Sequence, residues 1–439
     1  MILKTTPYQH QKKAYTFMHN KNYFALYMDM GTGKTRTIIE FIKQKKIETV
    51  LYFCPVSLKS TVKKEFIKHI KSPNYIIIDK QKNINNIYQI YIIGIESINS
   101  DRIFLLLYNL INKIKIKNTF AIVDESTYIK NMLALRTKRI IKLTQNIKYK
   151  CVMTGTPLTN YYQDLFSQMY FLSTSIINLR SYFSFCGKYL IYHDKYKNYI
   201  TGIRNKEQLL MKIKPYIFEV KKNECIDLPN KIYKIYYFDM SEKQKILYEN
   251  RKEQFFNEID SMEDIPSYII FKLFSDLQKI VNVTIDNYNP RLYLILSILN
   301  NTENKFIIFC KYINDIKQIA SELNNNCYIY TGSQTIKERD IIIENSIKEK
   351  KHILFTYGVG GIGLNLTHYS HMIFYNSLFQ YEKKIQAEDR IHRIGQKEKC
   401  IYYNIICENS IDERIHNNLN NKEQLILDFK KMIKNNIYF

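Results

Sequence analysis

The chain has no tryptophan and no C-x-x-C cysteine pair among its 439 residues. Its eight cysteines are scattered, so we expect small buried thiols in a reducing compartment, not a disulfide or zinc framework. No apolar run approaches the ~20 residues that span a bilayer, and residues 1–7 lack a signal-peptide layout. These absences predict a soluble, intracellular protein with no membrane partner. It would be cytoplasmic if bacterial or viral and nuclear if eukaryotic.

Negative charge is also scarce, because 41 acidic residues face 65 basic ones and leave a formal charge of +24. Such an excess is typical of proteins that bind a polyanion, above all nucleic acid. The lack of tryptophan and the heavy use of Lys, Ile, Asn and Tyr also indicate an AT-rich coding sequence, in which lysine accumulates without function. Charge alone therefore leaves both explanations open.

Short, continuous apolar runs recur along the chain and are separated by helix-like stretches at 35–46 and 60–70. Continuous runs are typical of strands buried on both faces of a parallel sheet. Their alternation with helices predicts an α/β fold. The runs cover 50–54, 75–78, 91–93, 120–123, 149–153, 306–309, 352–355, 372–375 and 401–406.

These runs fall into two groups, at about 20–155 and about 305–407, and the sequence between them is aromatic, charged and mostly helical. Residues 219–230 have the character of a connector. We therefore predict two lobes, each a parallel sheet flanked by helices, with short helical insertions near the junction. The expected divisions are 1–220 for the first lobe with an insertion at about 161–215, 221–290 for a connector and helical insertion, and 291–439 for the second lobe.

The segment Met28-Asp-Met-Gly-Thr-Gly-Lys-Thr35 follows an apolar run and opens a helical pattern. Glycines let backbone N–H groups approach phosphate oxygens, and a helix N-terminus adds partial positive charge. In such a loop Lys34 would pair with the β- and γ-phosphates and Thr35 would ligate magnesium. The strict pattern has glycine where this chain has Met28, so an ordinary glycine turn before a helix stays the alternative.

Two further strand ends carry polar groups. Ala121-Ile-Val-Asp-Glu-Ser126 ends an apolar run with two carboxylates, of which Asp124 would hold magnesium through water and Glu125 would polarise the attacking water. Thr154-Gly-Thr-Pro offers hydroxyls and backbone amides at the next strand end, where a link between the γ-phosphate and nucleic acid is one interpretation. A polar strand end and a simple turn are the alternatives.

The segment Gln386-Ala-Glu-Asp-Arg-Ile-His-Arg-Ile-Gly-Gln396 holds Arg390 and Arg393 three residues apart. On a helix this spacing puts both guanidinium groups on one face. Alone, such a pair is typical of a solvated basic face. Together with the phosphate loop, this segment predicts a composite nucleotide site. One lobe would bind the nucleotide and the other would complete the site, so that hydrolysis is coupled to closure of the lobes.

Read in order, these segments resemble the Swi/Snf family of DNA-dependent ATPases in helicase superfamily two, and nearly the whole chain is covered. The Ile-Lys-Asn tail that follows Asp124-Glu125 and the Arg-Ile-Gly-Gln of the late segment are marks of this family. The matching segments are 3–9 (the adenine motif), 30–35 (motif I), 54–59 (motif Ia), 124–131 (motif II), 154–160 (motif III), 221–229 (the connector), 356–367 (motif V) and 386–396 (motif VI).

The resemblance implies two RecA-like lobes that bind ATP and Mg²⁺ between them. Catalysis would involve Glu125 together with Arg390, the arginine finger that meets the γ-phosphate, and Arg393 beside it. The implied magnesium ligands are Thr35 and Asp124. The implied nucleotide-binding residues are Gln9, which would recognise adenine, and Gly31, Thr32, Gly33, Lys34, Thr35, Asp124 and Gly363.

Three features depart from the family pattern. Thr127 stands where motif II usually has histidine, residues 375–379 lack the usual Asp and Trp, and we expect no chromatin-reading module beside the core. We therefore expect a minimal bacterial, phage or large-virus type of member, a monomer that translocates on double-stranded DNA through backbone contacts without sequence specificity. The alternatives are a strand-separating helicase or restriction-type motor, and a DNA-binding scaffold with weak ATPase.

Overall fold

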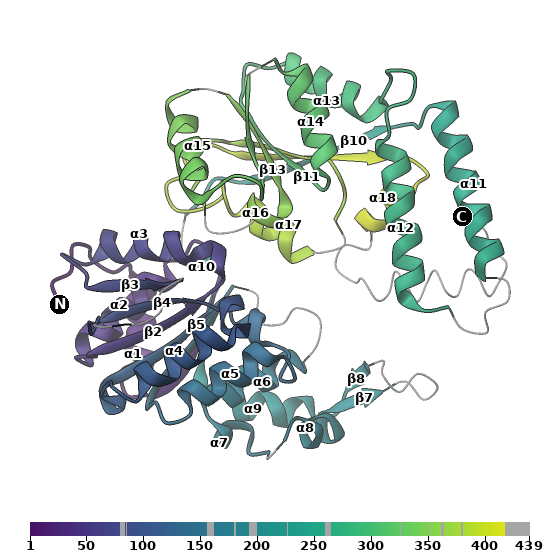
Figure 1. The fold of residues 1–439 in the computed structure, drawn as a ribbon. Helices are drawn as coiled ribbons and strands as arrows, with labels where there is room; N and C mark the ends of the chain where they lie inside the picture. Colours follow the sequence, from purple (N-terminus) through teal and green to yellow (C-terminus); the bar gives the residue numbers. More distant parts are fainter. Residues whose placement is uncertain are drawn as a thin grey trace. The chain divides into compact units, whose positions relative to one another are not determined.

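A computed structural model describes residues 1–79, 84, 86–155, 162–179, 181–192, 200–225, 227–259, 265–324, 326–349, 351–360, 364–378 and 381–417. The chain forms two compact units, Met1–Asp227 and Leu228–Phe439. Each is a parallel sheet with helices on both faces (Figure 1). The predicted α/β class is confirmed, and each of the nine apolar runs coincides with a strand, with ends that differ by one residue at most.

The sheet of the first unit has seven strands in the described residues, and every neighbouring pair is parallel. Its order is β3-β4-β2-β5-β6-β1-β9, so β1 lies two strands from β5, with β6 between them. The strands are β1 (Tyr23–Met28), β2 (Thr49–Cys54), β3 (Tyr75–Ile78), β4 (Ile90–Gly94), β5 (Thr119–Asp124), β6 (Tyr149–Thr154) and β9 (Ile217–Val220).

Alternate residues of these strands are buried under helices on opposite faces. On one face the Phe41 ring of α2 packs 5.1 Å from Phe24 and 5.0 Å from Phe120. The next residues, Ala25 and Ala121, belong to the core on the other face. The helices of this unit outside the insertion are α1 (Gln9–Met18), α2 (Lys34–Gln44), α3 (Lys59–His69), α4 (Asp101–Ile111), α5 (Leu135–Thr144) and the short α10 (Lys222–Cys225).

Between β6 and β9 lies an insertion of four helices in the described residues, with one antiparallel hairpin. These elements lie between residues 164 and 213, and the sequence analysis had expected helical insertion at about 161–215 without the hairpin. Leu209 and Ile213 join the core of the sheet, so the insertion is packed onto the unit. Its elements are α6 (Asp164–Leu172), α7 (Thr174–Ile177), α8 (Tyr182–Tyr189), β7 (Leu190–Tyr192), β8 (Ile200–Ile203) and α9 (Lys206–Ile213).

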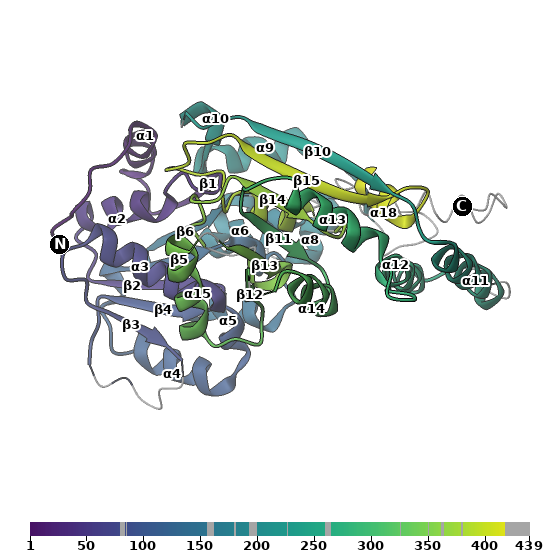
Figure 2. The same ribbon diagram turned by 90° about the horizontal axis from the view of Figure 1, so that it is seen from above.

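The sheet of the second unit has six described strands in the order β10-β15-β14-β11-β13-β12, again with parallel neighbours. Figure 2 shows β10 beside β15 at the edge. The range 221–290 was predicted as a connector and helical insertion, yet it contains β10. The strands are β10 (Lys231–Phe238), β11 (Phe306–Cys310), β12 (Cys327–Tyr330), β13 (His352–Thr356), β14 (His371–Phe374) and β15 (Cys400–Cys407).

Helices α13 and α14 cover the face that includes Ile308, and a second core on the opposite face includes Ile307. Helices α11 and α12 pack together in a third cluster with α18. The helices are α11 (Glu242–Ile259), α12 (Ser267–Asn282), α13 (Pro290–Asn300), α14 (Ile313–Glu322), α15 (Ile336–Lys348), α16 (Tyr357–Gly360), α17 (Tyr381–Glu388) and α18 (Ile411–Asn417).

The eight cysteines are free thiols, and six of them are buried. Burial raises the pKa of Cys54, Cys151 and Cys310, so these thiols behave as small apolar side chains. No helix in the described part of the chain combines the length and the apolar character needed to cross a bilayer.

Candidate active site

The phosphate-loop segment connects the end of β1 to the start of α2. Gly31 and Gly33 have φ angles of 80° and 83°, a left-handed conformation that favours glycine. The Lys34 ammonium turns back over the loop and donates to the carbonyl oxygens of Met28 at 2.9 Å and Asp29 at 3.4 Å. Asp29 in turn accepts from the Lys222 N–H at 2.8 Å, which ties the loop to the segment after β9. The loop is thus a glycine-containing turn that leads directly into the N-terminus of α2.

The carboxyl ends of β1, β6 and β5 lie side by side at this edge of the sheet, where open α/β sheets bind ligands. In the strand register Asp124 of β5 pairs with Met153, and Thr154 of β6 pairs with Tyr27. The next residue, Gly155, approaches the loop so closely that an added Cβ would lie 3.2 Å from the backbone nitrogen of Met30. Residues 156–160 of the same predicted motif lie outside the described residues.

Asp124 is the centre of a small hydrogen-bond network. Its Oδ2 accepts from the Tyr52 hydroxyl at 2.8 Å, and its Oδ1 accepts from the Glu125 N–H at 3.0 Å. The carboxyl group is buried, which raises its pKa, while the nearby Lys34 ammonium and the Tyr52 hydrogen bond act in the opposite direction. The Thr35 side chain also acts on the Tyr52 hydroxyl and lowers its pKa, against the rise that burial causes. Both predicted magnesium ligands therefore lie near one tyrosine.

This oxygen-rich set fits magnesium, which prefers carboxylate and hydroxyl oxygens and retains several waters. Thr35 supplies a hydroxyl at the start of α2 and Asp124 supplies a carboxylate at the end of β5. Lys34 adds a cation close enough to affect the Asp124 carboxyl electrostatically. The local chemistry thus has the components that a metal–phosphate group requires.

Glu125 follows Asp124 with a φ angle of 49°, which is uncommon for a residue with a side chain. The conformation begins a short 3₁₀ turn, Ser126–Ile129, and the turn is fixed by the Ser126 hydroxyl, which donates to Gln168 of α6 at 2.6 Å. Backbone strain of this kind gathers at functional sites because the surrounding structure must hold it. The turn holds the two carboxylates at the sheet edge.

Sequence reasoning did not find three residues that contact this site. Tyr52 lies inside an apolar run, where a tyrosine has no distinguishing signal. His10 and Gln11 are buried and hydrogen-bonded to the phosphate loop, whereas Gln9, the predicted adenine contact, is the exposed first residue of α1. A second glutamine two residues after that motif was the available signal.

In the second unit, Arg390 and Arg393 do not lie on a helix, where their spacing would have placed both on one face. Helix α17 ends at Glu388, and Arg390 follows in a turn and Arg393 in a bend. They nevertheless converge, since Arg390 Nη1 lies 3.5 Å and Arg393 Nη1 lies 3.0 Å from the Leu364 carbonyl oxygen. Arg390 Nε also donates to the Gln386 carbonyl at 2.9 Å. A shared backbone acceptor, rather than helical periodicity, brings the pair together.

The end of the same segment is organised by Gln396. Its side-chain nitrogen donates to the carbonyls of Tyr369 at 2.8 Å and Ile391 at 3.2 Å, and its oxygen accepts from the N–H groups of Lys397 and Glu398. This residue therefore shapes the loop that carries the arginines. Gly363, the predicted nucleotide contact of motif V, lies outside the described residues.

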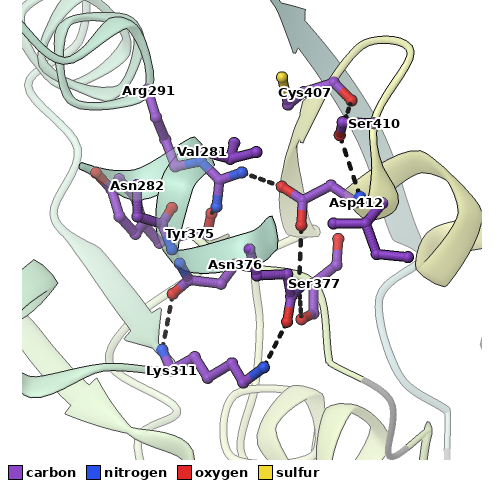
Figure 3. A network of polar contacts seen from close by, with 12 residues as sticks. Val281, Asn282, Arg291, Lys311, Tyr375, Asn376, Ser377, Cys407, Ser410 and Asp412 are labelled. Atoms are coloured by element: carbon purple, nitrogen blue, oxygen red, sulfur yellow. Dashed lines mark hydrogen bonds and ion pairs between the residues drawn. The ribbon is translucent and has the colours of Figure 1, made fainter. Parts of the chain in front are cut away.

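A buried polar network lies elsewhere in this unit (Figure 3). Arg291, 1% exposed, pairs with Asp412 and donates to the Tyr375 carbonyl at 2.9 Å. Gln278 of α12 donates to Asp412 at 3.0 Å and accepts from Lys311, the residue after β11. The network thus joins α12, α13, β11 and α18.

Comparison with known proteins agrees with this geometry. Residues 8–284 match the family model of the SNF2-related domain, and residues 290–395 match that of the helicase conserved C-terminal domain. The chain belongs to the SNF2-related family. This confirms the resemblance found in its motifs and, with the two parallel sheets, the two RecA-like lobes.

Several SNF2-related and helicase proteins are similar to the chain. An uncharacterized ATP-dependent helicase of Mycoplasma genitalium is 28% identical over 94% of the chain and 40% of that protein. A putative ATP-dependent helicase/translocase of Bacillus subtilis is 24% identical over 69% of the chain and 34% of that protein. The chain therefore spans less than half the length of these relatives.

Among solved structures, a Sulfolobus solfataricus SWI2/SNF2 ATPase core in complex with dsDNA is similar at a TM-score of 0.46 and 25% identity, with 99% of this chain and 94% of that one covered.

Proposed function

We propose that this chain is a DNA-dependent ATPase whose hydrolysis of ATP drives translocation on double-stranded DNA. The observation that carries the ATPase part is the cluster of Thr35, Tyr52 and Asp124 beside the Lys34 ammonium, in which Tyr52 donates to Asp124. A glycine loop, a lysine, a hydroxyl and a buried carboxylate at one sheet edge are the parts that phosphoryl transfer needs, because its catalysis is largely positioning and charge neutralisation.

Each residue of the first lobe has a role in this proposal. Backbone N–H groups of Gly31, Thr32 and Gly33 cradle the phosphates, and Lys34 leaves the loop carbonyls to pair with them. Thr35 and Asp124 hold Mg²⁺, which neutralises phosphate charge when bound. Glu125 orients and polarises the attacking water, and the exposed Gln9 recognises adenine.

The second lobe contributes Arg390 as the residue that meets the γ-phosphate when the lobes close, with Arg393 beside it. Because both guanidinium groups are held by carbonyls of their own unit, the pair is oriented before nucleotide arrives. Hydrolysis removes the γ-phosphate and with it the attraction that holds the lobes together. Alternating closure of this kind converts turnover into steps along DNA.

Double-stranded DNA is proposed as the partner for three reasons. The formal charge of +24 favours a polyanion, the family is one of DNA-dependent ATPases, and the relatives carry helicase or translocase in their names. Binding through phosphates releases counterions, so affinity should fall steeply with salt and depend little on sequence. We propose a monomeric translocase.

The names of the relatives also favour a second candidate, a strand-separating helicase. Steady-state ATPase assays with duplex, single-stranded, forked and RNA cofactors, joined to a strand-displacement assay, separate the two. We expect stimulation by duplex DNA without processive unwinding, and loss of activity in Lys34→Ala. Full turnover without DNA would contradict the proposal, and processive unwinding of plain duplex would favour the helicase.

A further inference from the structure

The start of α1 reaches the phosphate loop through two buried side chains, His10 (7% exposed) and Gln11 (2% exposed). The Gln11 side-chain nitrogen donates to the carbonyl oxygens of Thr32 at 3.2 Å and Gly33 at 3.3 Å. His10 Nε2 contacts the same Thr32 oxygen at 2.7 Å. Side chains of α1 thus contact the carbonyl oxygens of two successive peptide groups of the loop.

The orientation of the Gln11 amide is fixed by a further contact. Its oxygen accepts from the Tyr8 N–H at 2.9 Å, which leaves the NH₂ group facing the loop. The loop in turn provides the room, because a Cβ on Gly33 would lie 2.2 Å from the Gln11 nitrogen. Glycine at this position therefore serves both the left-handed backbone and the approach of Gln11.

These contacts help to fix where the loop's N–H groups point, together with the Thr37 N–H of α2, which donates to the Gly33 oxygen at 3.1 Å. In a planar trans peptide the C=O and N–H bonds point in opposite directions. Because α1 holds the Thr32 and Gly33 oxygens, the N–H groups of Gly33 and Lys34 are turned away from α1. Those N–H groups lie at the start of α2, where a phosphate loop binds phosphate.

We infer that Gln11, assisted by His10, is a positioning residue that holds the phosphate loop in its binding conformation. The inference rests on the proposed function, since it concerns binding of a nucleoside triphosphate at that site. Through the loop, Gln11 would affect binding of the phosphate chain and not of the base. This separates Gln11 from Gln9, which the family resemblance assigns to adenine and which is exposed two residues earlier.

The test compares binding of Mg²⁺–ATP with binding of inorganic tripolyphosphate, which has no base. Gln11→Met keeps most of the volume but no amide, and Gln11→Glu keeps the acceptor for Tyr8 but no donor for the loop. Gln44→Ala is the matched control, because that glutamine is exposed on α2 and its side chain donates to Glu40 on the same helix. Gln9→Ala is a second comparison, because it removes the proposed adenine contact and leaves the Gln11 bonds to the phosphate loop in place. Circular dichroism melts of the nucleotide-free proteins show which variants fold.

We expect each folded Gln11 variant to bind both ligands about tenfold more weakly, by the same factor, since a lost hydrogen bond to the loop affects both equally. The KM for ATP should rise more than kcat falls, and Gln44→Ala should match wild type. Folded Gln11 variants with affinities within twofold of wild type would overturn the inference. So would a loss confined to ATP, or an equal loss of tripolyphosphate binding in Gln9→Ala. A wild-type chain that binds neither ligand refutes the proposed function itself.

Discussion

The hydroxyl of Tyr52, on β2, donates a 2.8 Å hydrogen bond to the carboxylate of Asp124, on β5. Strands β2 and β5 are neighbours, with Tyr52 opposite Ile122, so the contact reaches diagonally to the end of the adjacent strand. Thr35 lies close enough to the same hydroxyl to lower its pKa. One tyrosine is therefore a neighbour of both groups that we assign to magnesium, and it holds the Asp124 carboxylate directly.

Tyr52→Phe should weaken magnesium-dependent activity without unfolding the protein. It removes a hydrogen bond that lowers the Asp124 pKa, so the buried carboxyl holds its proton to higher pH. We expect the Mg²⁺ concentration for half-maximal ATPase to rise about tenfold and the acid limb of the pH profile to move to higher pH. Tyr189→Phe, in the helical insertion, is the matched control. An unchanged magnesium titration would count against Asp124 as a ligand.

Gly33→Ala should abolish tight nucleotide binding for two independent reasons. The φ angle of 83° is costly for alanine, and the new Cβ would lie 2.2 Å from the Gln11 nitrogen. Gly187→Ala is the control, since no atom lies within 4 Å of the added methyl and the site is helical. There alanine should stabilise slightly, by up to about 1 kcal/mol. Isothermal titration with ATP checks both, and wild-type affinity in Gly33→Ala would contradict the loop assignment.

Arg390→Ala should stop hydrolysis while nucleotide binding persists. In the proposal the arginine stabilises the transition state from the second lobe, and such residues are worth about 10³–10⁵ in rate. Arg339→Ala removes an arginine that stacks on Tyr330 and serves as control. Single-turnover ATPase with saturating DNA measures the loss. Normal turnover in Arg390→Ala would exclude it as the arginine finger.

Most of the fold was predictable because strands buried on both faces leave continuous apolar runs. Strand β10 was not predicted, although it ends in the apolar run Ile235-Tyr-Tyr-Phe238. Lys231 and Lys234 interrupt its first half, and its Tyr233, Ile235 and Tyr237 side chains are exposed. The phosphate loop and Asp124 were found through short motifs. Tyr52 could not be found, since only the register of β2 with β5 shows that this tyrosine reaches a carboxylate.

The convergence of Arg390 and Arg393 has a different cause from the helical face that the sequence analysis considered. Helix α17 ends at Glu388, and both guanidinium groups instead lie within hydrogen-bonding distance of the Leu364 carbonyl oxygen. That acceptor is distant in sequence, and no local pattern identifies it. The side-chain bonds of Gln396, which shape this loop, have the same non-local character.

His352 should make the second unit less stable in mild acid. Its Nδ1 accepts from the Phe306 N–H at 3.1 Å, and burial lowers its pKa from 6.5 to about 4. The unfolded chain takes up a proton at this histidine below about pH 6.5, whereas the folded protein does so only near pH 4. The free energy of unfolding should therefore keep its full value above pH 6.5 and fall by about 2–3 kcal/mol as the pH is lowered toward 4. His352→Asn keeps an acceptor that does not titrate, so this loss should shrink. Urea unfolding followed by circular dichroism at pH 7.5 and pH 5 measures it, and equal pH dependence in both proteins would contradict the assignment.

The buried pair of Arg291 and Asp412 gives a final prediction, on stability (Figure 3). Both side chains are 1% exposed, so removing either partner leaves a buried charge without its ion-pair partner. Arg291→Met and Asp412→Asn should each destabilise the protein by about 3–5 kcal/mol. The double variant should lose much less than the sum, because it contains neither charge. Denaturant unfolding of the four proteins gives the coupling free energy, and additive losses would show that the two residues act independently.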